Sequence, residues 1–453
     1  MAFLDGFKRW TYASIAREIS RITRYADRVI QIDPLPGDTG VLRDRIQALE
    51  KSTASSEALG RVPIRGPRDS TVFLFNGNFN TSLDIQGLLE GSRVHMRRSD
   101  RIAVVLYNAY LAWIYQVADR LGLRNGPECT TFVTRTDLVQ LARLAGFEVV
   151  RLRPVVYLPW HFFGIGSLLN AVLPAIPGVR WLCLIAVVVL RPVSAVAGPR
   201  PSLTVVIPAR NERGNIEDAL IRLPDFQAPV EVIFVEGHSE DGTWEEIQRV
   251  AESWDRLRNL RVIALRQTGR GKADAVRLGF SKATGDVLTI LDADLTMPPE
   301  LLPRFYEAYC QGLGDFVNGT RLVYPMEGEA MRFLNRLGNI FFAKMVSWVL
   351  EARIADTLCG TKLIARADYE RCRAWRADFG EFDPFGDFEL LFPAAVLGLG
   401  VVDVPVAYRA RTYGSTSIRR FRDGLTLLRM VLKGLLRVRL GTGAPTRARP
   451  RSC

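Results

Sequence analysis

The amino-acid sequence predicts an α/β protein built from two domains. First, 453 residues exceed one ordinary domain, and a composition of 48% hydrophobic and 24% charged residues is typical of a folded chain. Second, apolar runs and amphipathic stretches alternate from residue 203 to residue 291. Third, the Pro/Gly/Ala-rich passage "RPVSAVAGPRPS" is typical of a linker. We therefore expect a first domain over residues 1–192, a linker over 193–202, a second domain over 203–418 and a basic amphipathic segment over 419–453.

The second domain is expected to hold a mostly parallel sheet flanked by helices. Repeated β-α units of this size build such a sheet. Trp244, Ile247 and Val250 recur at helical spacing, which supports one of the helices. The expected strands are Leu203–Ile207, Glu231–Val235, Arg261–Leu265 and Val287–Leu291, and the expected helices lie near Asn215–Leu223, Thr243–Trp254 and Ala273–Ala283.

The first half again favours α/β structure, but it contains one ambiguous stretch. Pro154–Val179 runs 26 residues without Lys, Arg, Asp or Glu, which is long enough to span a bilayer. Its four prolines would break the internal hydrogen bonds that a lipid-exposed helix needs, so we expect a soluble or interfacial packing segment. The elements expected around it are strands at Val72–Phe75, Ile102–Tyr107, Glu148–Arg153 and Leu182–Leu190 and a helix around Leu138–Ala145.

Composition narrows the classes of partner. The formal net charge is +12, and the basic residues are densest from Arg419 to Arg451. Such an excess fits an acidic membrane surface or phosphorylated substrates, while the aromatic-studded platform of a nucleic-acid binder is missing. Six cysteines without a C-x-x-C pair and only three histidines argue against a zinc site or a disulfide framework. The charged N-terminus does not resemble a signal peptide, so we expect a reducing compartment and no export.

The stretch "LTILDADLTMPPELL", residues 288–302, carries the most specific signal. Its apolar run suits a buried parallel strand, which places Asp292 and Asp294 at the strand's carboxyl end. Open α/β sheets bind their ligands at that end. Closely spaced carboxylates suit Mg²⁺ or Mn²⁺, although a D-x-D pair taken alone is explained as well by a solvated turn that caps the next helix.

A series of motifs places this pair in a known context. In order they are "TVVIPARNE", "FVEGHSEDGTWEEI", "GRGKADAVRLGF", "LTILDADLTMPPE", "VNGTRLVYPMEGEAMRFLNRLGN", "DTLCGTKLI", "FDPFGDFELLFPAA" and "VPVAYRARTYGSTS". The series resembles the family 2 glycosyltransferases of GT-A fold, and most closely their dolichol-phosphate mannose synthase branch, which uses polyprenyl phosphate. The resemblance implies a Rossmann-like sheet, a nucleotide-diphosphate sugar as donor and a divalent metal, Mg²⁺ or Mn²⁺.

The resemblance also assigns residues to the metal and the donor. Asp294 is the expected direct metal ligand, assisted by Asp292, and Thr296 stands where relatives often place a glutamine ligand. "SEDGT" is explained otherwise as a helix-capping turn. The donor-binding set is Pro208, Ala209, Arg210, Asn211 and Glu212 after the first strand, Glu236 and Asp241 after the second, and Lys272 and Asp292.

The acceptor is either a lipid phosphate or a sugar hydroxyl. A phosphate oxygen is already anionic and needs arginines to position it, whereas a hydroxyl needs a carboxylate base. The Q-x-x-R-W signature of the processive polysaccharide synthases is absent from the sequence, which favours polyprenyl phosphate. The catalytic set is Asp292, Asp294, Arg332 and Asp387, with Asp387 as the base for a hydroxyl acceptor. The acceptor-binding set is Arg321, Arg332, Glu389, Arg411 and Thr416.

The expected location is the cytoplasmic face of the membrane, as a peripheral protein. "NIFFAKMVSWVLEAR" and "FRDGLTLLRMVLKGLLRVRL" carry apolar stripes that fit either a membrane interface or a protein core. A hydroxyl of a glycan or lipid-linked saccharide is the alternative acceptor. A non-catalytic nucleotide- or lipid-binding protein is the alternative of another class.

The first half resembles the C-terminal half of a class I S-adenosylmethionine methyltransferase, over roughly residues 10 to 192. The likeness lies in "RIAVVLYN", "DLVQLARLAGFEVVRLRPVVYLPW" and "GVRWLCLIAVVVLRP". That fold needs a glycine-rich turn after its first strand, but "RVIQIDPLPGDTG" places Pro34 and Pro36 there, and Gln31 replaces an acidic residue. Only about 31 residues separate Gly40 from Val72, too few for the two β-α units of a complete fold. We expect a shortened, inactive relative, and an active methyltransferase is the alternative.

Overall fold

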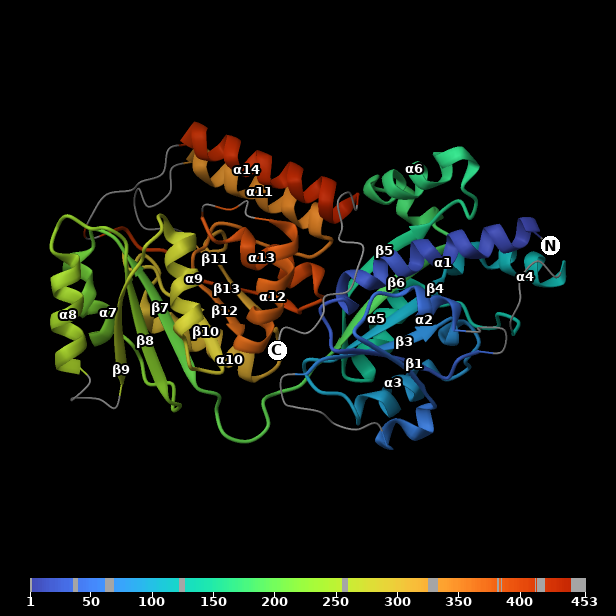
Figure 1. Cartoon of the computed structure of the whole chain (residues 1–453), viewed down its shortest axis with the longest axis horizontal. Coiled ribbons are helices and arrows are strands. Elements are labelled where there is room, and N and C mark those ends of the chain that lie inside the picture. Colours follow the sequence, from blue (N-terminus) through green and yellow to red (C-terminus); the bar gives the residue numbers. More distant parts are fainter. Residues whose placement is uncertain are drawn as a thin grey trace. The chain divides into compact units, whose positions relative to one another are not determined.

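The computed structural model describes residues 2–35, 40–61, 69–121, 127–254, 260–324, 333–380, 383, 385–411, 413 and 420–440. The chain divides into two compact units, and each unit holds one sheet with helices on both faces (Figure 1). Residues 195–395 and 399–435 form the second unit, and the rest of the described chain forms the first.

The sheet of the first unit has six strands in the order β2-β1-β3-β4-β6-β5. β1 pairs in parallel with β2 and β3, and β3 pairs in parallel with β4. β6 runs antiparallel to both β4 and β5. The expected strand at Leu182–Leu190 begins three residues later, because the 3₁₀ turn η6, Val179–Leu182, precedes it. The strands are β1 Arg28–Ile32, β2 Glu50–Ala54, β3 Thr71–Asn76, β4 Arg101–Tyr107, β5 Phe147–Val156 and β6 Ile185–Pro192.

Alternation along these strands feeds two hydrophobic cores, one on each face of the sheet. Val72 and Leu74 of β3 pack in the core that also holds Ile19 of α1. Phe73 and Phe75 pack in the opposite core, with α3 and α5. The helices of this unit are α1 Ala2–Thr23, α2 Val41–Arg45, α3 Ile85–Arg93, α4 Ala112–Arg120, α5 Arg135–Leu144 and α6 Ile165–Val172.

A buried ion cluster ties α1 to the sheet. Glu18 lies 2.8 Å from Arg151 and 3.3 Å from Arg153, and Arg21 lies 2.9 Å from the same carboxylate. Burial acts to raise the pKa of Glu18, but the three guanidinium groups lower the pKa to about 2. Since Glu18 stays charged well below pH 4, this cluster contributes stability over the whole physiological range.

The connection between β1 and β3 is short, as the number of residues between Gly40 and Val72 predicts. Between Gly40 and Val72, the described residues 40–61 and 69–72 hold α2, the strand β2 and a 3₁₀ turn ahead of β3. Asp33 has a left-handed backbone with φ 40°, and its carboxylate accepts the N–H of Ser56 at 2.9 Å. Pro34 follows this turn, whereas Pro36 lies outside the described residues. The side chain of Asp33 therefore lies within the turn after β1.

The uncharged stretch 154–179 forms short elements. It completes β5 and continues through the 3₁₀ turn η4, Phe162–Gly164, then α6 and the 3₁₀ turn η5, Leu173–Ala175. Within the described part of the chain, no helix is both long and apolar enough to cross a membrane. The expectation that this stretch is not a spanning helix agrees with that finding.

The sheet of the second unit has seven strands in the order β13-β11-β12-β10-β7-β8-β9. β10, β7, β8 and β9 pair in parallel, and β12 runs antiparallel to β10 and β11. Each strand expected between residues 203 and 291 is present. The strands are β7 Leu203–Ala209, β8 Val230–Glu236, β9 Arg261–Arg266, β10 Val287–Ile290, β11 Phe316–Thr320, β12 Lys362–Ala365 and β13 Val401–Pro405.

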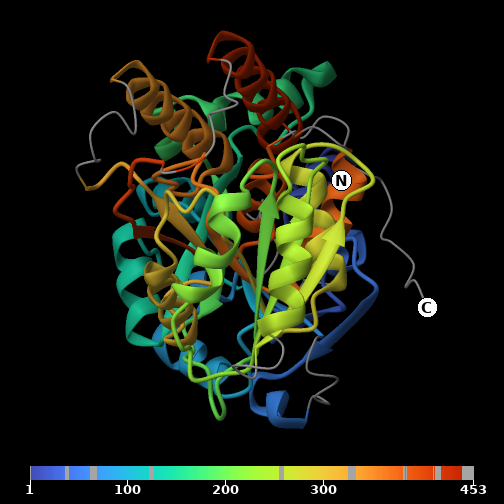
Figure 2. The same cartoon turned by 90° about the vertical axis from the view of Figure 1, so that its left-hand side faces the viewer.

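Helices cover both faces of this sheet. Figure 2 turns the unit that holds the sheet toward the viewer. Val205 and Ile207 pack with residues of α7, α8 and α10 in one large core. Val206 points the other way, and Gly279 of α9 packs so closely that a Cβ there would overlap it. Each helix expected between residues 203 and 291 is present. The helices are α7 Ile216–Ile221, α8 Thr243–Trp254, α9 Lys272–Lys282, α10 Leu302–Cys310, α11 Phe333–Leu350, α12 Arg366–Phe379, α13 Phe388–Val396 and α14 Arg420–Gly434.

Candidate active site

The carboxyl ends of β7, β8, β9 and β10 meet at one edge of the second sheet, because these strands run in parallel. The sequence predicts Pro208 and Ala209 beyond the first strand, and this is wrong: they are its last two residues, since the pairing with β8 continues to Glu236. The side chain of Ala209 is buried, and its carbonyl accepts the N–H of Gly237 at 2.9 Å. Arg210 is exposed directly after the strand.

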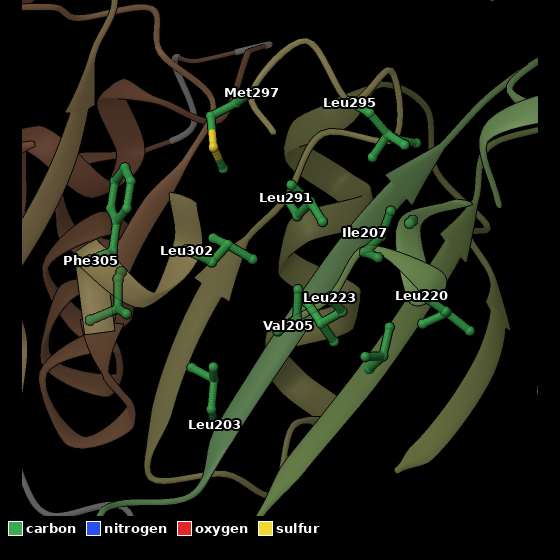
Figure 3. Close-up of a cluster of buried hydrophobic side chains, with 14 of the residues drawn as sticks. Leu203, Val205, Ile207, Leu220, Leu223, Leu291, Leu295, Met297, Leu302 and Phe305 are labelled. Carbon is green, nitrogen blue, oxygen red and sulfur yellow. The ribbon is translucent and has the colours of Figure 1, made fainter. Parts of the chain in front are cut away.

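The D-x-D pair follows β10, and its apolar neighbours explain its orientation. Leu291, Ala293 and Leu295 are buried in the core beside the sheet, where Figure 3 shows Leu291 and Leu295. Leu295 has a left-handed backbone with φ 50°, which closes a turn in which its N–H donates to the carbonyl of Asp292 at 3.1 Å. Anchoring alternate residues in the core leaves Asp292 and Asp294 outside it.

Asp294 is held by a hydroxyl and a guanidinium. Thr296 donates to its Oδ1 through the backbone N–H at 3.1 Å and through the hydroxyl at 2.7 Å. Arg411 donates to its Oδ2 through Nη2 at 2.6 Å. Thr296 therefore orients Asp294 here, and its role as a separate metal ligand stays a prediction.

Asp292 pairs with Lys272, the first residue of α9. Desolvation acts to raise the pKa of Asp292, but the ammonium of Lys272 holds the pKa below its ordinary value. Gly360 lies against this pair, and a Cβ at that position would overlap both Asp292 Oδ2 and Lys272 Nζ. Any larger residue at this position would require the ends of the Asp292 and Lys272 side chains to shift.

Arg411 connects the D-x-D pair to the loop after β7. Its Nη1 donates to Glu212 at 3.3 Å while its Nη2 holds Asp294. Glu212 is buried and also accepts from Asn215 at 2.7 Å. Burial raises the pKa of Glu212, because desolvation outweighs the attraction of Arg411. Asn211 has φ 54° and accepts the N–H of Glu240 at 2.9 Å, which ties this loop to the one after β8.

The acidic residues after β8 are engaged by their own loop. Glu236 is buried, accepts the N–H of Ser239 and lies 3.6 Å from Arg266. Asp241 accepts from Thr243 at the start of α8 and from the hydroxyl of Tyr413 at 3.3 Å. The helix-capping contact that the sequence offers as an alternative for Asp241 is thus made, and the donor roles of both residues stay predictions.

Of the residues predicted to bind the acceptor, Arg321 is committed elsewhere. It is buried in a bidentate ion pair with Asp356, at 2.8 Å and 3.0 Å, and it lies over the ring of Tyr408. Arg332 and Thr416 lie outside the described residues. Among the described residues predicted to bind the acceptor, Arg411 is the arginine with a direct hydrogen bond to the D-x-D pair.

The two carboxylates predicted from "GDFEL" are buried and paired. Asp387 Oδ1 accepts from Lys362 Nζ, which also donates to the carbonyl of Cys359. Glu389 lies 3.2 Å from Arg277 and 3.0 Å from Arg376. A base for a hydroxyl acceptor would have to act from within such a pair.

Four residues that complete this region have no counterpart in the predicted set: Asp356, Gly360, Lys362 and Asp383. Asp383 accepts the N–H groups of Phe385 and Phe388 ahead of α13, and burial raises its pKa to about 6. "DTLCGTKLI" is part of the motif series and contains three of them, but the pattern does not say which residue pairs with which. The partner of Lys362 lies 25 residues away along the chain, and the partner of Asp356 lies 35 residues away.

The carboxylates present fit a divalent cation that the donor helps to hold. Among the described residues, no group of three or more His, Cys, Asp or Glu side chains gathers as a metal cage. Mg²⁺ is commonly held by one or two carboxylates and the phosphates of a substrate, and Asp292 and Asp294 match that pattern.

Gly360→Ala should lower sugar transfer by about a hundredfold, because displacing catalytic groups by about 1 Å has a cost of that order. The added methyl group would push Asp292 and Lys272 apart. Transfer rates would be measured alongside thermal unfolding. Gly338→Ala is the matched control, since a Cβ there meets nothing within 4 Å. A Gly360→Ala enzyme as fast as the wild type would show that this packing does not matter.

Comparisons with known proteins identify this unit. The model of "Glycosyl transferase family 2" matches residues 204–370. A dolichol-phosphate mannosyltransferase from Pyrococcus furiosus is 29% identical over 48% of this chain, and the chain spans 59% of that relative's length. A dolichyl-phosphate hexose transferase from Haloferax volcanii is 31% identical over 52% of this chain and 96% of its own length. A solved mannosyltransferase from Pyrobaculum calidifontis, in complex with GDP-Man and Mn²⁺, is 20% identical over 56% of this chain and 68% of its own, with a TM-score of 0.38.

The sheet edge with its D-x-D pair is therefore that of a glycosyltransferase. The chain belongs to glycosyltransferase family 2, because it covers nearly the whole length of a relative with which it shares 31% of its residues. The family match starts at residue 204, so the first unit lies outside it.

Proposed function

We propose that this glycosyltransferase moves a hexose from a nucleotide-diphosphate sugar to a polyprenyl phosphate, with Mg²⁺ or Mn²⁺ at the D-x-D pair. The observation that carries the proposal is the alternation of charge at the sheet edge. Asp292 and Asp294 each face a cationic side chain, Lys272 and Arg411 respectively. A metal–diphosphate complex brings a positive metal ion and a negative diphosphate to such a site. The metal would replace the cationic side chains as the partner of the two aspartates, and the diphosphate would replace the aspartates as the partner of the cationic side chains.

The donor would bind where these charges meet. The metal, when bound, would carry the charge of the departing diphosphate. Asp294 and Asp292 would hold it, Thr296 would keep Asp294 oriented, and Lys272 would contact the diphosphate. Arg411 now engages the Asp294 oxygen that a metal would need, so it would release Asp294 and become available to the acceptor.

Two observations favour polyprenyl phosphate as the acceptor. Three relatives have a polyprenyl phosphate in their names. Two are the relatives from Pyrococcus furiosus and Haloferax volcanii, and the third is an undecaprenyl-phosphate 4-deoxy-4-formamido-L-arabinose transferase from Pectobacterium carotovorum, which is 35% identical over 24% of this chain. In addition, Asp387 is paired with the buried Lys362, and Glu389 is paired with the half-buried Arg376. An acceptor phosphate oxygen attacks the anomeric carbon without first losing a proton, so it needs no free carboxylate.

A polyprenyl acceptor requires contact with a membrane, and α14 offers a surface for it on the proposed cytoplasmic face. Leu425, Leu428 and Leu432 are exposed at helical spacing, and Arg422 and Arg429 lie among them. On α11 the predicted stripe is divided: Val349 is buried, Phe341 is exposed, and Ile340, Met345 and Trp348 are half-buried. The outer side of α14 is therefore the better candidate of the two.

A panel of nucleotide sugars, each incubated with the protein and Mn²⁺ in the presence of undecaprenyl or dolichyl phosphate, tests the proposal. We expect one donor to yield a lipid-linked sugar that depends on the added polyprenyl phosphate. Parallel reactions offer glycans and lipid-linked saccharides in place of the phosphate. Transfer only to those hydroxyl acceptors would contradict the proposal and favour the alternative.

For the first unit we propose a shortened methyltransferase-like domain that does not bind S-adenosylmethionine. The turn after β1 supports this, because Asp33 folds back onto Ser56 where a glycine-rich turn would approach a cofactor. Among the described residues, the single strand between Gly40 and Val72 also supports it.

Calorimetry should accordingly detect no binding of S-adenosylmethionine to the full chain at ordinary concentrations, because the backbone cannot approach the cofactor there. S-adenosylhomocysteine serves as a second ligand in the same titration. A micromolar dissociation constant for either would overturn the assignment as an inactive relative.

A further inference from the structure

We propose that the first unit carries a membrane-contact face of its own, formed by α4, α6 and the turn η6, which inserts into the interface of an anionic lipid bilayer. This face is separate from α14, which belongs to the second unit. It is named here the α4–α6 face.

Helix α4 buries one aromatic residue and exposes two apolar residues among polar ones. Tyr115 points inward and is buried, stacked on Tyr107 with ring centroids 4.9 Å apart. Trp113 and Val117 point outward and are exposed, and Tyr110 continues the same side one turn earlier. A surface helix of a globular protein normally presents polar residues on its outer side. The outer side of α4 presents Trp113 and Val117 to solvent beside the exposed Gln116 and Arg120.

Helix α6 repeats this arrangement next to a strained aromatic residue. Ile165 and Leu168 are exposed one turn apart on α6, which Figure 1 shows set apart from the sheet. Phe163, just before the helix, is fully exposed and has a left-handed backbone with φ 52°. A bulky residue rarely adopts that backbone, and strain of this kind gathers at functional positions. The turn thus holds a phenyl ring out into solvent at a cost in energy.

The turn η6 packs against the residues that precede α4. Asn108, just before α4, donates from its side chain to the carbonyls of Trp181 and Cys183, at 2.7 Å and 2.6 Å. The rings of Tyr110 and Trp181 meet edge to face at 5.7 Å. Along the chain α6 leads through η5 into η6, so η6 links the segment that follows α6 to the residues that precede α4.

Charge and residue type indicate a bilayer as the occupant. Exposed tryptophan and tyrosine rings are the residues that gather at membrane interfaces. A pocket beside η6 is lined by Tyr110, Trp181, Arg135 and Arg180, and none of the described residues that line it carries a carboxylate. Arginines at the rim of an apolar surface attract anionic headgroups.

Quenching by brominated lipid provides a local test, because the chain contains its own reporters. Of its eight tryptophans, all within the described residues, only Trp113 and Trp181 are exposed. Vesicles of phosphatidylglycerol and brominated phosphatidylcholine should quench the fluorescence of the full chain. The Trp113→Phe, Trp181→Phe variant should still sediment with the vesicles and lose most of that quenching. Undiminished quenching in the variant would overturn the proposal.

Replacing exposed apolar residues of the α4–α6 face by glutamate tests how much the face contributes to vesicle binding. Phe163→Glu with Leu168→Glu should weaken vesicle binding by about tenfold or more, since two large apolar side chains would no longer enter the lipid. Leu83→Glu is the matched control, because Leu83 is an exposed leucine of the same unit that is not part of α4, α6 or η6. The pair of substitutions should have the same effect in a chain that also carries Leu428→Glu and Leu432→Glu on α14.

Three outcomes would overturn the proposal: a wild-type chain that binds no vesicles, a Phe163→Glu, Leu168→Glu chain that binds as well as the wild type, or a wild-type dimer that this variant dissociates in light scattering. The last would assign the face to a second copy. Thermal unfolding confirms that each variant is folded. Because no donor or acceptor is added, these results are independent of the transfer assay that tests the proposed function.

Discussion

Asp294→Asn should lower sugar transfer by on the order of a thousandfold or more, because a bound cation supplies several kcal/mol of charge stabilisation and each 1.4 kcal/mol is tenfold in rate. The fold should survive, since the asparagine oxygen still accepts from Thr296 and the apolar neighbours on both sides still anchor the turn. What is lost is the negative charge that Arg411 opposes here and that a metal would need.

Two measurements separate this loss of charge from a loss of fold. Transfer is assayed with saturating Mn²⁺ and again after EDTA, and Mn²⁺ binding is titrated in the presence of a nucleoside diphosphate. Glu300→Gln is the matched control, because Glu300 is an exposed carboxylate six residues away that pairs with Arg222 at 2.8 Å. Wild-type transfer in EDTA, or near-normal transfer by Asp294→Asn, would refute the metal assignment of the D-x-D pair.

The sequence predicts the second sheet well, because each parallel strand is a continuous apolar run, and such a run indicates a strand that is buried on both faces. The D-x-D pair follows for the same reason, since the end of such a run marks the edge of the sheet. The end of β7 shows the limit of this reasoning. Pro208 and Ala209 differ from the apolar run before them, yet pairing with β8 keeps both in the strand.

Long-range ion pairs are where sequence reasoning fails at this site. Arg321, Asp387 and Glu389 look like free substrate contacts in the motif series. In the structure each is neutralised by a partner 13 to 112 residues away, and those partners lie on α9, on α12, on β12 and in the segment before β12. A residue type in a motif indicates chemistry, but only the fold shows whether another side chain of the protein already uses that charge.

Asp387→Asn should destabilise the second unit by about 3–5 kcal/mol, because removing one partner of a buried ion pair leaves the other charge uncompensated. Lys362 is 1% exposed and donates to Asp387 and to the carbonyl of Cys359. Loss of transfer in this single variant would therefore not identify a catalytic base.

The variant that removes both charges, Asp387→Leu with Lys362→Met, distinguishes the two acceptors. Replacing a buried pair by apolar side chains of similar size is close to neutral, so the free energy of unfolding should return near the wild-type value. With a polyprenyl phosphate acceptor, whose oxygen is already ionised, transfer should return to within about tenfold, because no group has to remove a proton. With a hydroxyl acceptor the stable variant would still lack its base, at a cost on the order of 10²–10⁴ in rate.

Urea unfolding and transfer at saturating acceptor would be measured for the wild type, Asp387→Leu, Lys362→Met and the double variant, which together form a double-mutant cycle. Coupling between the two sites should appear in stability and in transfer together, since one buried pair governs both. Arg411→Ala should reduce transfer severely under the same conditions, because the acceptor phosphate would lose the guanidinium that now holds Asp294. A double variant that is stable and inactive, beside an Arg411→Ala enzyme with normal turnover, would exclude polyprenyl phosphate and assign Asp387 as the base for a hydroxyl.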